Sequence, residues 1–184
     1  MKSILLIFAG GIGSGKTTLS TKIAKELGWQ YLSFGNYIRS IAKKQGKSLS
    51  RASLQELGEF MIKSQGWEKF CKKFLENGNW EKSKPCIIDG LRHIEILNVL
   101  KKINVPYDVY LVVISLSYKN RSKRLLKREE NRKINLSQYE SHSTEIQTNS
   151  KIRDFADLTL NGKKSVSKLS KKIYTWLNSL PVKH

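Results

Sequence analysis

The most informative segment of this 184-residue chain is Gly10-Gly11-Ile12-Gly13-Ser14-Gly15-Lys16-Thr17. It matches the pattern G-x-x-x-x-G-K-[ST], and it follows the apolar run 4–8, which is typical of a buried strand. Apolar residues then recur at helical spacing from residue 19 to residue 27. A strand, a glycine-rich loop and a helix in this order indicate a phosphate-binding loop.

Each residue type in this loop has a physical role. Glycines let the backbone turn tightly, so that successive N–H groups point at phosphate oxygens, and the start of the following helix adds positive potential. Lys16 is predicted to reach the β- and γ-phosphates of ATP, and the Thr17 hydroxyl is predicted to ligate Mg²⁺. The loop residues predicted to bind ATP are Gly11, Gly13, Ser14, Gly15, Lys16, Thr17 and Thr18.

The charge balance is unusual, because 34 lysines and arginines face 15 acidic residues and give a net charge of +19. Either the protein has a lysine-rich solvated surface, or its field attracts a polyanion such as nucleic acid. The sequence leaves both interpretations open. The two cysteines, Cys71 and Cys86, lie too far apart for a zinc site and suit a reducing cytoplasm, and no stretch is long enough to span a membrane.

Apolar patterning predicts that strands and helices alternate along the chain. Predicted strands occupy residues 4–8, 29–34, 85–88, 109–114 and 158–160, with helices between them and a break near Gly66. This alternation predicts an α/β fold with a five-stranded parallel sheet, covered by helices on both faces, and ligands at the carboxyl ends of the strands.

Charged residues follow the ends of two predicted strands. Arg39 lies just past the second strand, and the third ends in Asp89-Gly90-Leu91-Arg92. Two arginines at one edge of a sheet can clamp a second phosphate group, facing the first. Asp89 is predicted to hold Mg²⁺, either directly or through water.

Three stretches, 10–17, 34–39 and 89–92, resemble the signature regions of P-loop nucleoside monophosphate kinases. The resemblance covers most of the chain and looks closest to small archaeal adenylate-kinase-like proteins, with similarity to dephospho-coenzyme A kinases near residues 157–162. It implies a P-loop nucleotide kinase fold in a single domain, residues 1–184. Within that domain, a helical region at 35–80 would bind the acceptor, and the polar segment 129–153 would form a lid.

The resemblance also implies roles for individual residues. Arg124 and Arg128 lie about one turn apart, like the arginines that open the lid of adenylate kinases, so Arg124 would stack on the adenine of ATP and Arg128 would contact its phosphates. Apart from the resemblance, most aromatic residues around the second strand are expected in the core, and Phe34 or Tyr37 is a candidate to stack on the base of the acceptor. The acceptor-binding set is then Phe34, Gly35, Arg39 and Arg92.

The chain departs from the family pattern in ways that leave the base specificity open. Phe34-Gly35-Asn36 replaces the usual Thr-Gly-Asp, and Asp-Gly-Leu-Arg at 89–92 is one residue shorter than the adenylate kinase motif. The lid segment has no zinc cysteines.

The leading hypothesis is ATP-dependent phosphoryl transfer to a nucleoside or deoxynucleoside monophosphate, giving the diphosphate and ADP, with Mg²⁺ as cofactor. The predicted catalytic residues are Lys16, Asp89, Arg92 and Arg128. One alternative is a kinase of another small phosphorylated acceptor, such as dephospho-coenzyme A. A second is a nucleic-acid-associated ATPase, whose surface would include Lys119, Arg121, Lys123, Arg124, Lys127 and Arg128.

Overall fold

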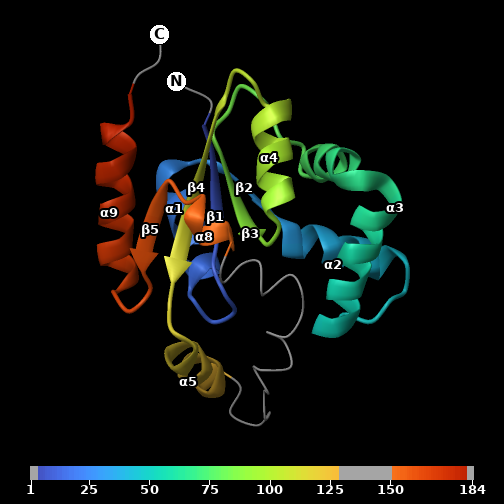
Figure 1. Ribbon diagram of the computed structural model, residues 1–184, viewed down its shortest axis with the longest axis horizontal. Coiled ribbons are helices and arrows are strands. Elements are labelled where there is room, and N and C mark those ends of the chain that lie inside the picture. The colour runs from blue at the N-terminus through green and yellow to red at the C-terminus, as the bar shows by residue number, and fades with distance from the viewer. Residues whose placement is uncertain (1–3, 129–150, 182–184) are drawn as a thin grey trace.

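A five-stranded parallel sheet forms the centre of the computed structural model, which describes residues 4–128 and 151–181. The strand order is β2-β3-β1-β4-β5, so β1 lies in the middle of the sheet (Figure 1). The strands are β1 (Ile4–Ala9), β2 (Gln30–Ser33), β3 (Cys86–Leu91), β4 (Asp108–Ser115) and β5 (Leu158–Asn161). The predicted five-stranded parallel sheet is therefore confirmed.

Helices cover both faces of this sheet (Figure 1). Leu5 and Ile7 of β1 share a core with the helices on one face, and Leu6 and Phe8 share a core with α1 and α9 on the other. This division follows from the alternation of side chains along a strand. The described helices are α1 (Lys16–Leu27), α2 (Phe34–Lys44), α3 (Arg51–Asn77), α4 (Ile94–Ile103), α5 (Tyr118–Arg128), α8 (Lys151–Asp154) and α9 (Val166–Ser179).

All five strands differ from the predicted ranges by one to three residues at an end, and two of these differences affect the candidate site. Phe34 begins α2 instead of ending β2, because the Ser33 hydroxyl accepts a hydrogen bond from the Asn36 N–H and caps the helix. Strand β3 continues past Asp89 to Leu91, because its pairing with β1 extends to Ala9. Asp89 therefore lies within the strand, and Arg92 follows its end.

The predicted break near Gly66 is present as a kink within α3. Gly66 has φ 78° and ψ 163°, a conformation that is open essentially to glycine alone. It divides α3 into two helical segments, and the second packs Phe70 and Phe74 into the core.

The segment predicted as a lid, 129–153, lies outside the described residues except for the start of α8. Among residues 4–128 and 151–181, no helix is both long and apolar enough to cross a membrane.

Candidate active site

The loop between β1 and α1 has the shape that a phosphate-binding loop requires. Gly10, Gly13 and Gly15 have φ values of 147°, 74° and 94°. A Cβ atom on Gly10 would lie 2.7 Å from the Ile114 carbonyl oxygen, so the loop passes too close to β4 for any side chain there. Helix α1 begins directly after Gly15, which leaves its first N–H groups available to an anion.

Asp89 lies beside this loop because β3 pairs with β1, and Asp89 is the partner of Phe8. Asp89 is buried, with 3% of the residue exposed. Oδ2 accepts a hydrogen bond from Thr17 Oγ1 at 2.7 Å and another from the Tyr31 hydroxyl at 3.1 Å. Oδ1 is buried and has no hydrogen-bond partner among the described residues.

These oxygens fit a magnesium ion. Mg²⁺ prefers hard oxygen ligands, takes one or two from the protein and completes its shell with water and substrate phosphates. Thr17 and Asp89 offer a hydroxyl and a carboxylate whose Oδ1 has bonding capacity left. Among the described residues no group of three or more His, Cys, Asp or Glu side chains converges.

Tyr31 is a site residue that the sequence did not single out. Burial, and next to it the negative charge of Asp89, raise the pKa of Tyr31 to about 12. The phenol therefore remains a hydrogen-bond donor to the carboxylate throughout the physiological range. Tyr31 lies two residues before Ser33, the β2 partner of Asp89, and only this register could have indicated the contact.

Two arginines of α5 face the phosphate-binding loop. Arg124 donates to the Ser14 carbonyl at 3.0 Å and to the Gly162 carbonyl at 2.6 Å, so it joins the loop to the turn after β5. Arg121 donates to the Leu116 carbonyl at 3.0 Å and to the Ile12 carbonyl at 3.4 Å. The sequence analysis placed Arg121 on a basic surface, but the residue is only 5% exposed. Arg121 and Arg124 are three residues apart, so they share the face of α5 that contacts the loop.

Three predicted acceptor residues lie at the carboxyl edge of the sheet, near the ends of the neighbouring strands β2 and β3. Arg92 follows β3 directly and is half-buried, and the exposed Arg39 donates to Asn36 Oδ1 at 3.1 Å. Gly35 lies beside Arg39, since a Cβ on it would make a contact of 3.4 Å with Arg39 Nη1. Arg128 ends α5, and its side chain lies outside the described part of the chain.

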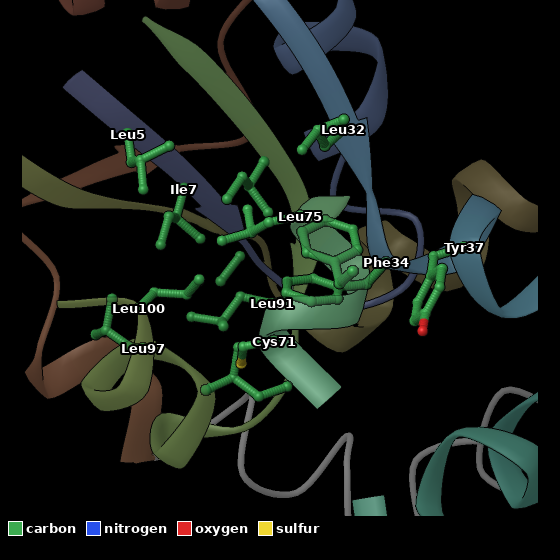
Figure 2. Packing of buried hydrophobic residues seen from close by; sticks show 14 of the residues in the cluster. Leu5, Ile7, Leu32, Phe34, Tyr37, Cys71, Leu75, Leu91, Leu97 and Leu100 are labelled. Carbon is green, nitrogen blue, oxygen red and sulfur yellow. The ribbon is translucent and has the colours of Figure 1, made fainter. Parts of the chain in front are cut away.

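Phe34 does not lie where the sequence reasoning expected it. Phe34 is 6% exposed and lies among buried hydrophobic residues (Figure 2). Its ring stacks on that of Phe74, with the centroids 4.0 Å apart. Tyr37 is equally buried and packs edge-on against the Phe74 ring, with the centroids 5.7 Å apart. The expectation that Phe34 stacks on an acceptor base is therefore wrong, because the first turn of α2 uses its aromatic side chains to hold α3.

Comparison with known proteins places the chain in a family. It belongs to the family described as AAA domain, whose model matches residues 6–147. It is similar to a UPF0200 protein of the archaeon Thermoplasma volcanium, with 27% identity over 125 residues, which is 68% of this chain and 67% of the relative. It is also similar to a cytidylate kinase of Saccharolobus islandicus, with 42% identity over 43 residues, which is 23% of each chain. The chain thus spans about two thirds of the length of the UPF0200 relatives that it matches.

Solved structures show the same fold. The chain is similar to shikimate kinase from Acinetobacter baumannii in complex with shikimate, with a TM-score of 0.60 and 17% identity, covering 98% of this chain and 97% of that one. At this identity the likeness shows the fold alone, which is that of the P-loop kinases. The family, the archaeal relatives and this fold together confirm the predicted resemblance to P-loop nucleotide kinases.

Proposed function

We propose that this protein transfers the γ-phosphoryl group of ATP to a nucleoside or deoxynucleoside monophosphate, giving the diphosphate and ADP. The observation that carries the proposal is the Thr17–Asp89 contact of 2.7 Å beside Lys16, at the sheet edge that Arg39 and Arg92 also border. The cytidylate kinase similarity supports the nucleotide acceptor over the 43 residues that it covers.

The donor half of the reaction uses the phosphate-binding loop. The N–H groups at the start of α1 and the Lys16 ammonium would bind the β- and γ-phosphates. Mg²⁺ held by Thr17, and by Asp89 directly or through water, would neutralise charge on the β- and γ-phosphate oxygens. Arg121 and Arg124 hold the loop in shape through its carbonyls.

The acceptor half places one phosphate opposite the other. Arg39 and Arg92 would orient the acceptor phosphate, one oxygen of which attacks the γ-phosphorus while the bond from that phosphorus to the β–γ bridging oxygen breaks and ADP leaves. Arg128 would stabilise the charge on the transferring group. No proton has to be removed, because the attacking phosphate oxygen is already anionic.

A second candidate is phosphorylation of another small acceptor, such as dephospho-coenzyme A, and the shikimate kinase neighbour supports a non-nucleotide acceptor. An acceptor hydroxyl must lose its proton to a base. Residues 34–39 contain no carboxylate, and the carboxylate of Asp89, whose Oδ2 accepts hydrogen bonds from Thr17 and Tyr31, is assigned to Mg²⁺ in this proposal. These features favour an acceptor that carries a phosphate at the reacting atom.

The test is phosphoryl transfer from Mg-ATP to each ribo- and deoxynucleoside monophosphate and to dephospho-coenzyme A, with ADP and the phosphorylated product measured for each. Lys16→Ala should lower the rate by at least about 10²-fold, because it removes the positive charge that stabilises the transferring phosphoryl group. Arg92→Ala should raise the acceptor KM and lower kcat without changing ATP affinity.

Lys25→Ala is the matched control, because Lys25 is an exposed lysine on the same helix as Lys16. It should leave the rate unchanged. ADP formation without any acceptor, or an unaltered rate for Arg92→Ala, would contradict the proposal.

A further inference from the structure

Helix α5 carries positively charged side chains on two different faces. Arg121 and Arg124 point inward and donate to carbonyls of the phosphate-binding loop and of the turn after β5. Lys119, Lys123 and Lys127 are exposed. We call these three lysines the outer stripe.

The outer stripe repeats every four residues, so its members stack along one side of the helix at a rise of about 6 Å each. No acidic residue occurs anywhere in Tyr118–Arg128, and the next in the sequence, Glu129 and Glu130, come after the last lysine of the stripe. Like charges at this spacing destabilise a helix. The repulsion within the outer stripe therefore destabilises α5 in the isolated protein, and an anionic partner would remove this repulsion.

The positive surface continues beyond α5. Arg124 bonds to the Gly162 carbonyl, which fixes the turn after β5 beside the helix. Lys163 and Lys164 follow that glycine and are exposed. Figure 1 shows α5 beyond the carboxyl end of β4, away from the helices that cover the sheet.

We propose that the outer stripe binds the phosphate backbone of a single-stranded nucleic acid. Lysine ammonium groups are point charges that suit phosphate contacts of no particular sequence. Tyr118, 48% exposed at the start of the same helix, has the Arg121 guanidinium carbon 5.9 Å from its ring centroid. The ring face away from Arg121 offers a platform on which an unpaired base can stack, and a duplex has no such base to offer.

Other polyanionic surfaces fit less well. An interfacial membrane helix needs an apolar face toward the lipid, but Leu125 of α5 is buried in the protein and Leu126 is the one exposed leucine of the helix. An acidic protein would neutralise the lysines but would not use the exposed ring of Tyr118. The stripe and the ring together favour a nucleic acid strand.

The test measures the affinity of the protein for a fluorescent single-stranded RNA of about 12 nucleotides, by anisotropy at about 50 mM and about 200 mM salt, without ATP. Binding should weaken steeply with salt. The variant Lys119→Ala/Lys123→Ala/Lys127→Ala should bind at least about tenfold more weakly at low salt, and its log–log salt slope should be flatter by about 2, because three phosphate contacts are lost.

The matched control is Lys63→Ala/Lys69→Ala/Lys73→Ala, which removes three exposed lysines from α3. It should keep the affinity and slope of the unaltered protein. Tyr118→Ala should weaken binding without changing the slope, because it removes stacking and no charge.

A single-stranded DNA of the same length should bind comparably, and a duplex of that length more weakly. Equal losses in the two triple variants, or equal binding of polyglutamate, would show a non-specific charge effect and overturn the proposal. Because the assay contains no ATP, failure of the proposed phosphoryl transfer would not change its outcome. Since alanine favours helices, the α5 variant should stay folded, which thermal unfolding checks.

Discussion

At the scale of single residues, the site depends on how one carboxylate is held. Asp89 is nearly inaccessible to solvent, and its Oδ2 accepts from Thr17 on one side and from Tyr31 on the other. The two donors have different tasks, because Thr17 is also the predicted Mg²⁺ ligand, whereas Tyr31 lies outside the loop. If Thr17 ligates Mg²⁺, the Tyr31 hydroxyl would still hold the orientation of the Asp89 carboxylate.

Tyr31→Phe tests this positioning role. The ring and its packing remain, while the 3.1 Å hydrogen bond to Asp89 is lost. We expect the Mg²⁺ concentration needed for ATP binding to rise several-fold, measured by titrating Mg²⁺ against a fluorescent ATP analogue. The control is Tyr37→Phe, which removes a phenol buried elsewhere in the core and should leave the Mg²⁺ dependence unchanged. An unaltered Mg²⁺ dependence in Tyr31→Phe would show that the phenol does not position Asp89.

The same substitution should change how stability depends on alkaline pH. The pKa of Tyr31 is raised from 10.0 to about 12 in the folded protein. The folded protein holds the phenol proton of Tyr31 more tightly than the unfolded chain does. The resulting contribution to the free energy of unfolding is complete below pH 10 and is lost as the pH rises through 12. The difference in unfolding free energy between the protein and Tyr31→Phe should therefore shrink over that interval, as followed by urea unfolding at several pH values. A constant difference would contradict the assigned pKa.

At the scale of elements, the kink in α3 depends on one glycine. A Cβ on Gly66 would meet nothing within 4 Å, so the only obstacle to a side chain is its φ of 78°. Gly66→Ala should lower the free energy of unfolding by about 1–3 kcal/mol, the usual cost of forcing a non-glycine residue into such a conformation. Urea unfolding measures this loss.

Gly58→Ala on the same helix is the matched control. Its Cβ would make an ordinary contact, 3.7 Å from Ile38 Cδ1, in regular helix. It should be neutral or stabilising by up to about 1 kcal/mol, because alanine favours helices more than glycine does. Equal effects of the two substitutions would mean that α3 adapts at Gly66 and that the kink is not fixed by that residue.

The sequence predicted the elements well where one strong local signal was present. Buried strands appear as apolar runs, and glycines with Lys16 define the loop after β1, so the order of strands and helices could be predicted. The roles of Phe34 and Arg121 could not. Whether a side chain at a helix start meets a ligand or the core depends on the neighbouring helix, and that contact joins residues far apart in the chain.

At the scale of the whole molecule, strand order brings the candidate site together. Loop 10–17, Asp89 and the start of α2 belong to segments far apart in the sequence, and they meet because β1 pairs with β3 and β3 with β2. Helix α5 adds two inward arginines at the same edge. The cations that contact the loop thus lie on the same helix as the exposed outer stripe.

The net charge of +19 should make stability depend on salt. The ion pairs of Lys22 with Glu26 and of Lys72 with Glu68 lie on exposed helical turns. Repulsion among the remaining lysines is screened as the ionic strength rises. We expect the Tm to increase by about 2–5 °C between about 20 mM and about 500 mM NaCl, measured by circular dichroism. The outer stripe contributes three of these charges, so the variant Lys119→Ala/Lys123→Ala/Lys127→Ala should have a higher Tm at low salt. Its Tm should also increase less with salt.

A Tm that falls as salt is added would mean that attractive pairs outweigh the repulsion in the folded protein.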